Sequence, residues 1–323
     1  MTAIAVRGGA GPAEALHPVW AETPIPGPGQ ILIRVEAAGV NRPDILQRSG
    51  AYPPPPGAPT TLGLEVAGEV AATGEGVARW VTGDKVCALL GGGGYAQYAL
   101  VDARHALPIP VGFDFLQAAA LPETVFTVFA NIFEIGRLKA GETLLLHGAT
   151  SGIGVMAIQM AKATGARVVA TSRGADKARA ALALGADRAI DSTAEDFVVA
   201  IQGEGGADVV LDMVAGPLLP RNLEALRIEG RVVVIAVQGG ARAEIDVARL
   251  MVRRLTLAGS TMRPRSADEK ARLARAVEAH VWPWLASGAV KPVIDRSFPL
   301  AEAAAAHAHL ESGDHIGKVM LVP

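Results

Sequence analysis

Two kinds of hydrophobic pattern alternate along this chain. Short apolar or alternating runs, separated by turns rich in glycine and proline, fill residues 1–121 and predict a compact, partly open β-barrel. Between 122 and 262, strand-like apolar runs alternate with helical stretches, which predicts a doubly wound parallel sheet. Residues 263–323 return to the pattern of the first part, so the parallel-sheet domain is predicted to be inserted into the β-rich one.

The clearest pattern lies between 143 and 177. Residues 143–147 predict a buried strand, the small residues of 148–154 predict a close turn, and 155–162 predict a helix that leads to a second strand at 167–170. This order is typical of the unit that binds a dinucleotide, with the pyrophosphate at the start of the helix. Because Ala149 and Ser151 stand where the fingerprint has glycine, an ordinary strand-to-helix turn is the alternative.

The same reasoning predicts the other elements. Strands of the first part are expected at 31–35, 64–70, 85–89 and 95–99. The parallel sheet gains strands at 188–191, 207–212, 231–236 and 255–259, which makes six, and helices at 177–184 and 218–226. The last part predicts helices at 268–286 and 300–311, with strands at 291–295 and 318–322. Ligands of such a sheet bind at the carboxyl ends of its strands, here His147, Thr171, Asp212 and Ala236.

The end of the second sheet strand indicates the kind of dinucleotide. An NAD site usually has Asp or Glu there to bind the ribose 2′-hydroxyl. This chain instead has Ser172 and Arg173, with Lys177 a short distance further on. One hydroxyl and two cations suit a 2′-phosphate, so NADPH is the predicted cofactor. A solvated helix start is the alternative explanation for the two cations.

Composition limits the classes of function. Half of the 323 residues are hydrophobic, 19% are charged and the net charge is −2, so neither nucleic acid nor an anionic membrane is an expected partner. No apolar run is long enough to span a membrane and no signal peptide is evident, which predicts a soluble, cytoplasmic protein. The single cysteine, Cys87, excludes internal disulfides and is predicted to lie in a core strand.

Several short motifs follow one another in the order of a known family: Asn-Arg-Pro-Asp at 41–44, Gly-Ala-Tyr with four prolines at 50–56, Leu-Gly-Leu-Glu at 62–65, Pro-Glu-Thr at 122–124, Lys-Ala-Gly-Glu at 139–142, Ser-Gly-Ile-Gly at 151–154 and Ile-Gly-Lys at 316–318. With them, nearly the whole chain resembles the zinc-free quinone oxidoreductases of the medium-chain dehydrogenase/reductase superfamily. Residues 52–56, 257–263 and 294–295 are most similar to the tumour-suppressor-inducible NADPH:quinone oxidoreductase subgroup.

The resemblance implies an α/β architecture with two domains. A GroES-like, β-rich catalytic domain would comprise residues 1–121 and the return segment 263–323. A Rossmann domain that binds NADPH, with a doubly wound parallel six-stranded sheet, would be inserted at 122–262.

The resemblance also implies the site residues. It places the hydroxyl of Tyr52 and the amide of Asn41 beside the nicotinamide, where they would donate to the acceptor carbonyl. Packing of Tyr52 on the proline run and a turn-stabilising role of Asn41 are the alternatives. The implied cofactor-binding residues are Asn41, Thr127, Ala149, Ser151, Gly152, Ile153, Ser172, Arg173, Lys177, Val237, Ser260, Thr261 and Lys318. Many relatives have a tyrosine on the phosphate side where this chain has Asp191 and Ser192.

No metal is expected. Zinc-dependent relatives have Cys at the position of Asn41 and His at that of Leu64, and the one cysteine of this chain lies elsewhere. His307 and His309 are two residues apart on a predicted helix, so they do not face one another and are expected on its surface.

The resulting hypothesis is an NADPH-dependent quinone reductase that uses no metal. An enoyl or alkenal double-bond reductase is the alternative from the same class, and an NADPH- or RNA-binding protein with little turnover is the alternative from another class. The resemblance also implies a homodimer joined through the sheet edge near residues 255–259, because an apolar edge strand without a partner promotes aggregation.

Overall fold

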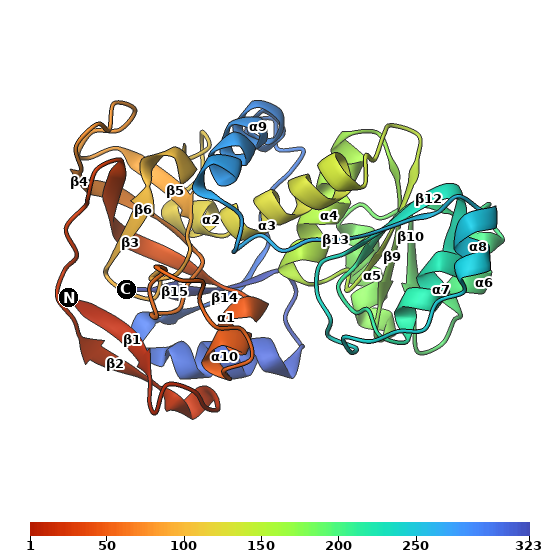
Figure 1. Cartoon of the computed structure of the whole chain (residues 1–323), viewed down its shortest axis with the longest axis horizontal. Coiled ribbons are helices and arrows are strands. Elements are labelled where there is room, and N and C mark those ends of the chain that lie inside the picture. The colour runs from red at the N-terminus through yellow and green to blue at the C-terminus, as the bar shows by residue number, and fades with distance from the viewer. The chain divides into compact units, whose positions relative to one another are not determined.

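The computed structural model describes residues 1–323, which divide into two compact units (Figure 1). Unit 1 consists of Met1–Phe126, Arg263–Ala286 and Pro292–Pro323, and unit 2 consists of Thr127–Met262 and Ser287–Lys291. The second unit thus interrupts the first in the chain. No helix has both the length and the apolar character that a membrane span requires.

Unit 1 is built mainly from strands. These are β1 Thr2–Val6, β2 Leu16–Trp20, β3 Gln30–Val40, β4 Glu65–Thr73, β5 Lys85–Leu89, β6 Tyr98–Asp102, β7 Ala106–Pro108, β14 Ile294–Pro299 and β15 Lys318–Val322. Its helices are α1 Arg42–Arg48, α2 Phe115–Ala119, α9 Ala267–Ala286 and α10 Ala303–Ser312, with 3₁₀ turns at Ala13–Ala15, Ala103–His105 and Leu300–Glu302. Helix α3, Pro122–Val128, continues from unit 1 into unit 2.

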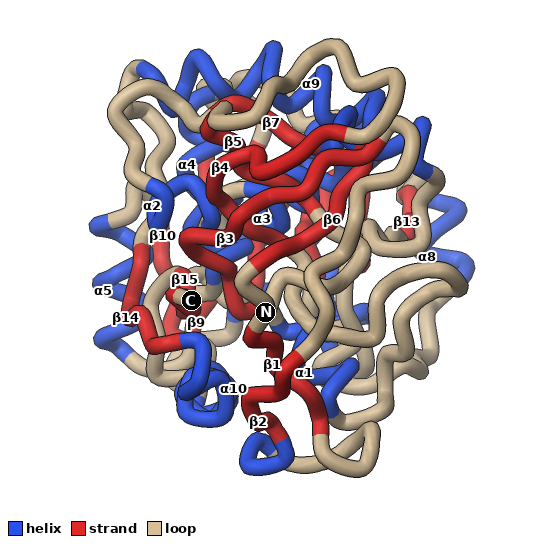
Figure 2. The backbone as a smooth tube through the Cα atoms, turned by 90° about the vertical axis from the view of Figure 1, so that its left-hand side faces the viewer, coloured by secondary structure: helices blue, strands red, loops and turns tan.

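Seven of the unit 1 strands form one largely antiparallel sheet (Figure 2). Its order is β14-β15-β3-β4-β5-β7, and β6 pairs with β3 as well. Strand β3 therefore joins the first part of the chain to the return segment through its antiparallel pairing with β15. The predicted strands at 31–35, 85–89 and 318–322 are confirmed, and Cys87 is buried in β5 as expected.

Two strands begin at other residues than the sequence predicts. The predicted strand at 95–99 is wrong at its start: β6 begins at Tyr98, and Ala96 makes only an isolated bridge to Ala3. The predicted strand at 291–295 begins at Ile294 instead and extends to Pro299. In the first case, the Ile4 N–H donates to the Tyr95 carbonyl and the Gln97 N–H to that of Thr2, but this pairing with β1 is too short to count as a strand.

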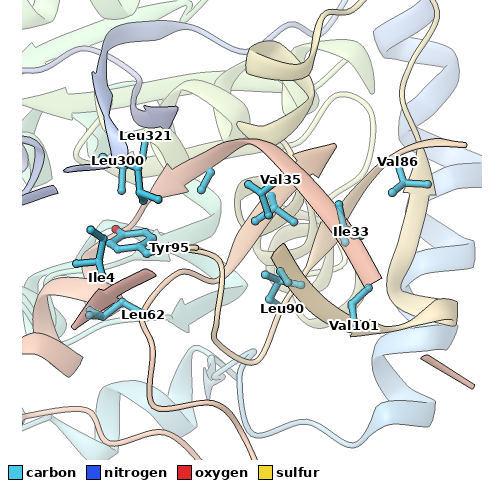
Figure 3. Close-up of a cluster of buried hydrophobic side chains, with 14 of the residues drawn as sticks. Ile4, Ile33, Val35, Leu62, Val86, Leu90, Tyr95, Val101, Leu300 and Leu321 are labelled. Carbon is cyan, nitrogen blue, oxygen red and sulfur yellow. The ribbon is translucent and has the colours of Figure 1, made fainter. Parts of the chain in front are cut away.

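The core of unit 1 gathers around Tyr95 (Figure 3). Its ring, wholly shielded from solvent, lies beside Ile4 and close to Leu62, with Leu300 and Leu321 of the return segment on the other side. Residues from both ends of the chain therefore bury one another, and neither end of unit 1 forms this core alone.

A buried line of polar side chains runs through this core. The Tyr95 hydroxyl donates to Asp44 Oδ2 at 3.2 Å and lies 3.0 Å from His307 Nε2. The other ring nitrogen of His307 lies 3.2 Å from Arg48 Nη1, and Arg48 forms a two-pronged pair with Glu311. Since Arg48 can only donate, His307 accepts at Nδ1 and donates at Nε2.

The predicted surface position of His307 is therefore wrong, because this residue is fully buried. Desolvation, followed by the charge of Arg48, lowers the pKa of His307 to about 3, so the ring is neutral at physiological pH. The spacing of two histidines on a helix could not reveal a partner that lies 259 residues away in the chain.

Unit 2 contains the predicted parallel sheet. Its strands are β8 Thr143–His147, β9 Arg167–Ser172, β10 Arg188–Asp191, β11 Ala207–Asp212, β12 Leu226–Val234 and β13 Thr256–Gly259. Its helices are α4 Gly152–Ala163, α5 Ala175–Ala183, α6 Phe197–Gln202, α7 Leu218–Ala225 and α8 Val247–Val252, with a π-helical turn at Phe129–Ile135. The order β10-β9-β8-β11-β12-β13, with every pairing parallel, confirms the six-stranded doubly wound sheet.

Candidate functional site

The turn between β8 and α4 has the backbone geometry of an anion site. Gly148 has a φ of +70°, and a Cβ on Gly154 would lie 2.3 Å from the Gly148 carbonyl oxygen, so both positions require glycine. The Ser151 hydroxyl accepts from the Gly154 N–H at 3.0 Å and donates to the Gly148 carbonyl at 2.8 Å. Ser151 is therefore the helix N-cap, which leaves the amides of Gly152 and Ile153 as the donors that point out of the helix start.

Three of the predicted strand ends are tied together behind this turn. His147 Nδ1 lies 2.8 Å from Thr171 Oγ1, and its Nε2 lies 2.7 Å from Asn222 Oδ1. Asn222 in turn donates to Asp212 Oδ2 at 2.9 Å. The network also supports the turn, because the Thr171 carbonyl accepts from the amide of Ala149. Burial lowers the pKa of His147, which keeps the ring neutral in this network.

The end of β9 carries an unsatisfied hydroxyl. Ser172 is the last residue of that strand, and its Oγ is buried without a hydrogen-bond partner. No carboxylate residue follows directly: Arg173 is exposed, and Lys177 lies half-buried in the first turn of α5. The acid at the end of the next strand, Asp191, accepts from the backbone of Gly174 and Thr193. A buried polar atom without a partner is rare, and here it lies where the predicted 2′-phosphate would bind.

In unit 1, the predicted residues Asn41 and Lys318 lie together around a carboxylate that the sequence did not single out. Lys318 Nζ lies 2.6 Å from Glu65 Oε1 and 2.5 Å from Asn41 Oδ1. Asn41 Nδ2 donates to the same Oε1 at 2.9 Å, and the Glu123 N–H donates to Oε2 at 2.8 Å. Both ends of the Asn41 amide are therefore already bonded within unit 1.

A glycine makes room for this cluster. A Cβ on Gly39 would lie 2.0 Å from Glu65 Oε1, so only glycine on β3 allows the carboxylate to reach Asn41 and Lys318. Glu65 is the first residue of β4, and it is fully buried. An ion pair is the condition under which a buried carboxylate is tolerated.

Tyr52 is half-buried and lies beside Arg263, the first residue of the return segment. Its ring packs against the guanidinium of Arg263, whose central carbon is 5.6 Å from the ring centroid. Burial raises the pKa of Tyr52, so its phenol keeps its proton and remains a donor at neutral pH. Arg263 is itself buried; its Nε donates to the Gly91 carbonyl at 2.9 Å, whereas Nη1 and Nη2 have no partner.

The remaining predicted residues are distributed over unit 2. Thr127 lies on α3, where its carbonyl accepts from Asn131, and Ser260 and Thr261 follow directly after β13. Val237 follows β12 and lines a cavity of about 280 Å³ together with Gly216 and Leu257. The roles predicted for these residues stay predictions.

Sequence reasoning missed Glu65, Glu123 and Arg263. The strand pattern from Leu64 to Val70 contains two charged residues, Glu65 and Glu69, and a carboxylate next to buried apolar positions was an available signal for Glu65. Nothing local distinguishes Arg263 from Arg265, because the difference lies in what each side chain meets in the folded chain.

Family models match both units. The model of the alcohol dehydrogenase GroES-like domain matches residues 27–111, and the model described as zinc-binding dehydrogenase matches residues 152–279. Among the described residues, no group of three or more His, Cys, Asp or Glu side chains is arranged to hold a metal ion.

Individual proteins agree with the family models. The rat quinone oxidoreductase is 34% identical over 304 residues, which cover 93% of this chain and 91% of that protein. The Escherichia coli quinone oxidoreductase, solved in complex with NADPH, is 30% identical and superposes over the whole of both chains with a TM-score of 0.91. A structure described as an NAD-dependent alcohol dehydrogenase is also 30% identical over the whole of both chains, with a TM-score of 0.86. The GroES-like domain and the Rossmann sheet are thus both shown.

The carboxyl group of Glu123 predicts a pH-dependent stability. Desolvation, with the nearby charge of Glu65, raises its pKa from 4.5 to about 8. Between these two values the folded protein holds a proton that the unfolded chain has lost, so the free energy of unfolding falls as the pH rises. Replacing Glu123 by Gln should remove this contribution, which is about 1.4 kcal/mol per pH unit at most.

The measurement is the denaturant midpoint of wild type and Glu123→Gln between about pH 5 and pH 8. The denaturant midpoint of Glu123→Gln should rise relative to that of wild type as the pH increases. The midpoint of Glu302→Gln, a change at an exposed residue, should differ from that of wild type by the same amount at every pH. Parallel curves for Glu123→Gln and wild type would show that the carboxyl is already ionised at the lower pH.

Proposed function

The chain belongs to the quinone oxidoreductase family of the medium-chain dehydrogenase/reductase superfamily, and we propose that it reduces quinones with NADPH and without a metal ion. The choice of NADPH rests on the end of β9, where the buried hydroxyl of Ser172 has no hydrogen-bond partner and stands in place of the acid that an NAD site usually has. The observation that carries the acceptor part is the pairing of a protonated phenol with an unpartnered guanidinium. The finer resemblance to the tumour-suppressor-inducible subgroup stays a prediction.

The residues of unit 2 suit NADPH. Gly152 and Ile153 would bind the pyrophosphate through their amides at the positive end of the α4 dipole. Ser172 would donate to the 2′-phosphate with Lys177 and Arg173 nearby, and such a charge-assisted contact is about twice as strong as a neutral one. Bound NADPH would supply the hydride. Two solved proteins of the family described as binding NADPH support this choice.

In unit 1, Tyr52 is the proposed donor to the acceptor carbonyl. Asn41 was predicted to share this role, but its amide is already occupied by Glu65 and Lys318. We therefore assign Asn41 to the cluster that positions the strand ends, and Tyr52 to the acceptor. Because a quinol is aromatic, reduction of a quinone needs orientation and one or two donors rather than a strong Lewis acid.

The donor set around Asn41 does not suit zinc. The available groups there are an amide, a carboxylate and an ammonium, and the ammonium of Lys318 already pairs with the carboxylate of Glu65. Catalytic zinc sites use three ligands from His, Cys and carboxylates. The thiol of Cys87 lies in the core, where burial raises its pKa well above the usual range. We therefore propose chemistry that uses no zinc.

Turnover with parallel acceptors tests the proposal. NADPH oxidation should be followed by absorbance with an ortho-quinone, a para-quinone and a 2-alkenal, and NADH should be run beside NADPH on any acceptor that reacts. We expect turnover of a quinone, with a preference for NADPH. Turnover of the alkenal alone would favour double-bond reduction, and tight NADPH binding without turnover would favour the binding-protein alternative.

The cofactor assignment makes a separate prediction at Lys177. Lys177→Ala should raise the dissociation constant of NADPH about 10- to 100-fold, because a hydrogen bond between charged groups contributes about 1.5–3 kcal/mol. The constant for NADH should change little. Fluorescence titration measures both, with Lys162→Ala as the control, because Lys162 pairs with Asp187 at the far end of α4. If Lys177→Ala weakened the binding of NADPH and NADH by the same factor, Lys177 would not contact the 2′-phosphate.

We also propose the homodimer that the sequence predicted, joined through β13. This edge strand has no partner on its outer side, and the neighbouring α8 has no buried residue; Met251 and Val252 are 71% and 77% exposed. An exposed edge with apolar side chains suits pairing with a second copy.

Light scattering of wild type at micromolar concentration should give the mass of a dimer. Met251→Asp should shift it toward the monomer, whereas Val111→Asp, at an equally exposed valine of unit 1, should not. A monomeric wild type would contradict the proposal. The cytoplasmic location and the lack of a nucleic-acid partner stay predictions.

A further inference from the structure

One buried cation in unit 1 has two nitrogen atoms without a hydrogen-bond partner. Arg263 is only 5% exposed, yet Nη1 and Nη2 of its guanidinium have no hydrogen-bond partner. Its Nε donates to the Gly91 carbonyl, which fixes the direction of the side chain. Buried charges in proteins are normally paired, so an arginine with two unused donor groups indicates that a ligand completes its coordination.

The guanidinium lies between a close backbone approach and an aromatic ring. Gly92 lies beside it, and a Cβ there would stand 3.4 Å from Nη2 and 2.7 Å from the Pro59 carbonyl oxygen. The ring of Tyr52 covers another side of the guanidinium. Arg263 thus holds its head group next to the phenol that we assign to the acceptor.

The local charge balance favours an anion. The carboxyl of Asp44 accepts hydrogen bonds from Asn41, Gly63 and Tyr95 and makes none with Arg263, and desolvation raises its pKa to about 6. The pKa of Glu123 is about 8, so this group carries a proton at neutral pH. A second cation, Lys270, donates to the Arg263 carbonyl at 2.7 Å. No carboxylate is hydrogen-bonded to Nη1 or Nη2 of Arg263.

We propose that Arg263 is the catalytic residue that binds the acceptor oxygen on which negative charge develops. This inference rests on the proposed function. When the acceptor ring receives a hydride, it gains two electrons and one hydrogen, and the reduced nicotinamide is oxidised. The negative charge that remains is then carried by a former carbonyl oxygen of the quinone, to which Nη1 and Nη2 of Arg263 and the hydroxyl of Tyr52 donate hydrogen bonds. A proton from solvent then completes the quinol.

Arg263 in this role takes the place of a Lewis acid. A preorganised donor that meets charge only in the transition state accelerates the reaction, and loss of one such donor typically costs about 100- to 1000-fold in turnover. The two parallel donors of a guanidinium also suit an acceptor that offers two neighbouring oxygens.

The first test compares three variants of the full chain. Arg263→Gln should lower kcat for the quinone about 100-fold or more and leave NADPH affinity unchanged. Arg263→Lys, which keeps the charge but not the paired donors, should retain part of the rate. Arg265→Gln is the matched control, because Arg265 lies on the same segment and pairs with Glu269. Wild-type rates in Arg263→Gln would overturn the proposal.

The second test needs no turnover. Para-nitrophenol, titrated in the presence of NADP⁺, imitates the reduced ring with charge on oxygen, and its phenol and phenolate forms absorb at different wavelengths. Wild type should bind the phenolate and lower its apparent pKa, whereas Arg263→Gln should lose this shift while keeping a normal thermal melt. An unchanged shift in Arg263→Gln would refute the anion site.

The two readouts separate the two proposals. A wild type that reduces no acceptor but binds the phenolate through Arg263 would overturn quinone reduction and support the anion site. A wild type that reduces quinones at the same rate as Arg263→Gln would support the function and overturn the role of Arg263. Should Arg263→Gln fail to fold, a reduced rate and a weakened phenolate shift in Arg263→Lys would support the proposal, and wild-type values of both would overturn it.

Discussion

The buried carboxylate of Glu65 is the constraint on which the architecture of unit 1 depends. A carboxylate without access to water costs several kcal/mol unless donors surround it. Its donors come from three separate stretches of chain: Asn41 after β3, the Glu123 backbone at the start of α3, and Lys318 at the start of β15. One ion pair and two hydrogen bonds to the same carboxylate thereby hold β3, the start of α3 and the final strand together.

A second polar line fastens the return segment further along the same core. Arg48 at the end of α1 pairs with Glu311 on α10. The neutral ring of His307 is hydrogen-bonded to Arg48 through one nitrogen and to the Tyr95 hydroxyl through the other. Each member has its donors and acceptors matched, so the line stabilises one arrangement of α10 against the core rather than a family of arrangements. A chain interrupted by an inserted unit needs such specific contacts, because its two parts are far apart in sequence and cannot rely on local turns.

The sequence predicted what depends on local chemistry. The run from β8 through α4 to β9 was predicted in the right order, with β8 exact and the ends of α4 and β9 within three residues, because buried strands and a glycine turn leave marks within a few positions of one another. The functional environment of Asn41 was not predictable in this way, because Glu65 and Lys318 lie 24 and 277 residues away. His307 illustrates the same limit: its helix was correct, but its partners Tyr95 and Arg48 belong to distant segments. The strand predicted at 95–99 begins only at Tyr98, because Tyr95 and Gln97 pair with the distant strand β1 over too few residues to form a strand, and no local pattern shows the length of that pairing.

Two of the buried cations of unit 1, Lys318 and Arg263, have very different surroundings. Lys318 forms an ion pair with Glu65 and a hydrogen bond with Asn41, so its charge stabilises the contact of β15 with β4 and with the end of β3. Arg263 lies beside groups that could have neutralised it, yet Asp44 is engaged elsewhere and Glu123 keeps its proton. The Tyr52 ring and the Gly91 carbonyl offset part of the cost of burying the guanidinium, and in our proposal an anionic oxygen of the acceptor offsets the rest. If the fold needed Arg263 for structure alone, pairing it as Lys318 is paired would be more stable; leaving it unpaired makes sense where charge appears during the reaction and disappears after it.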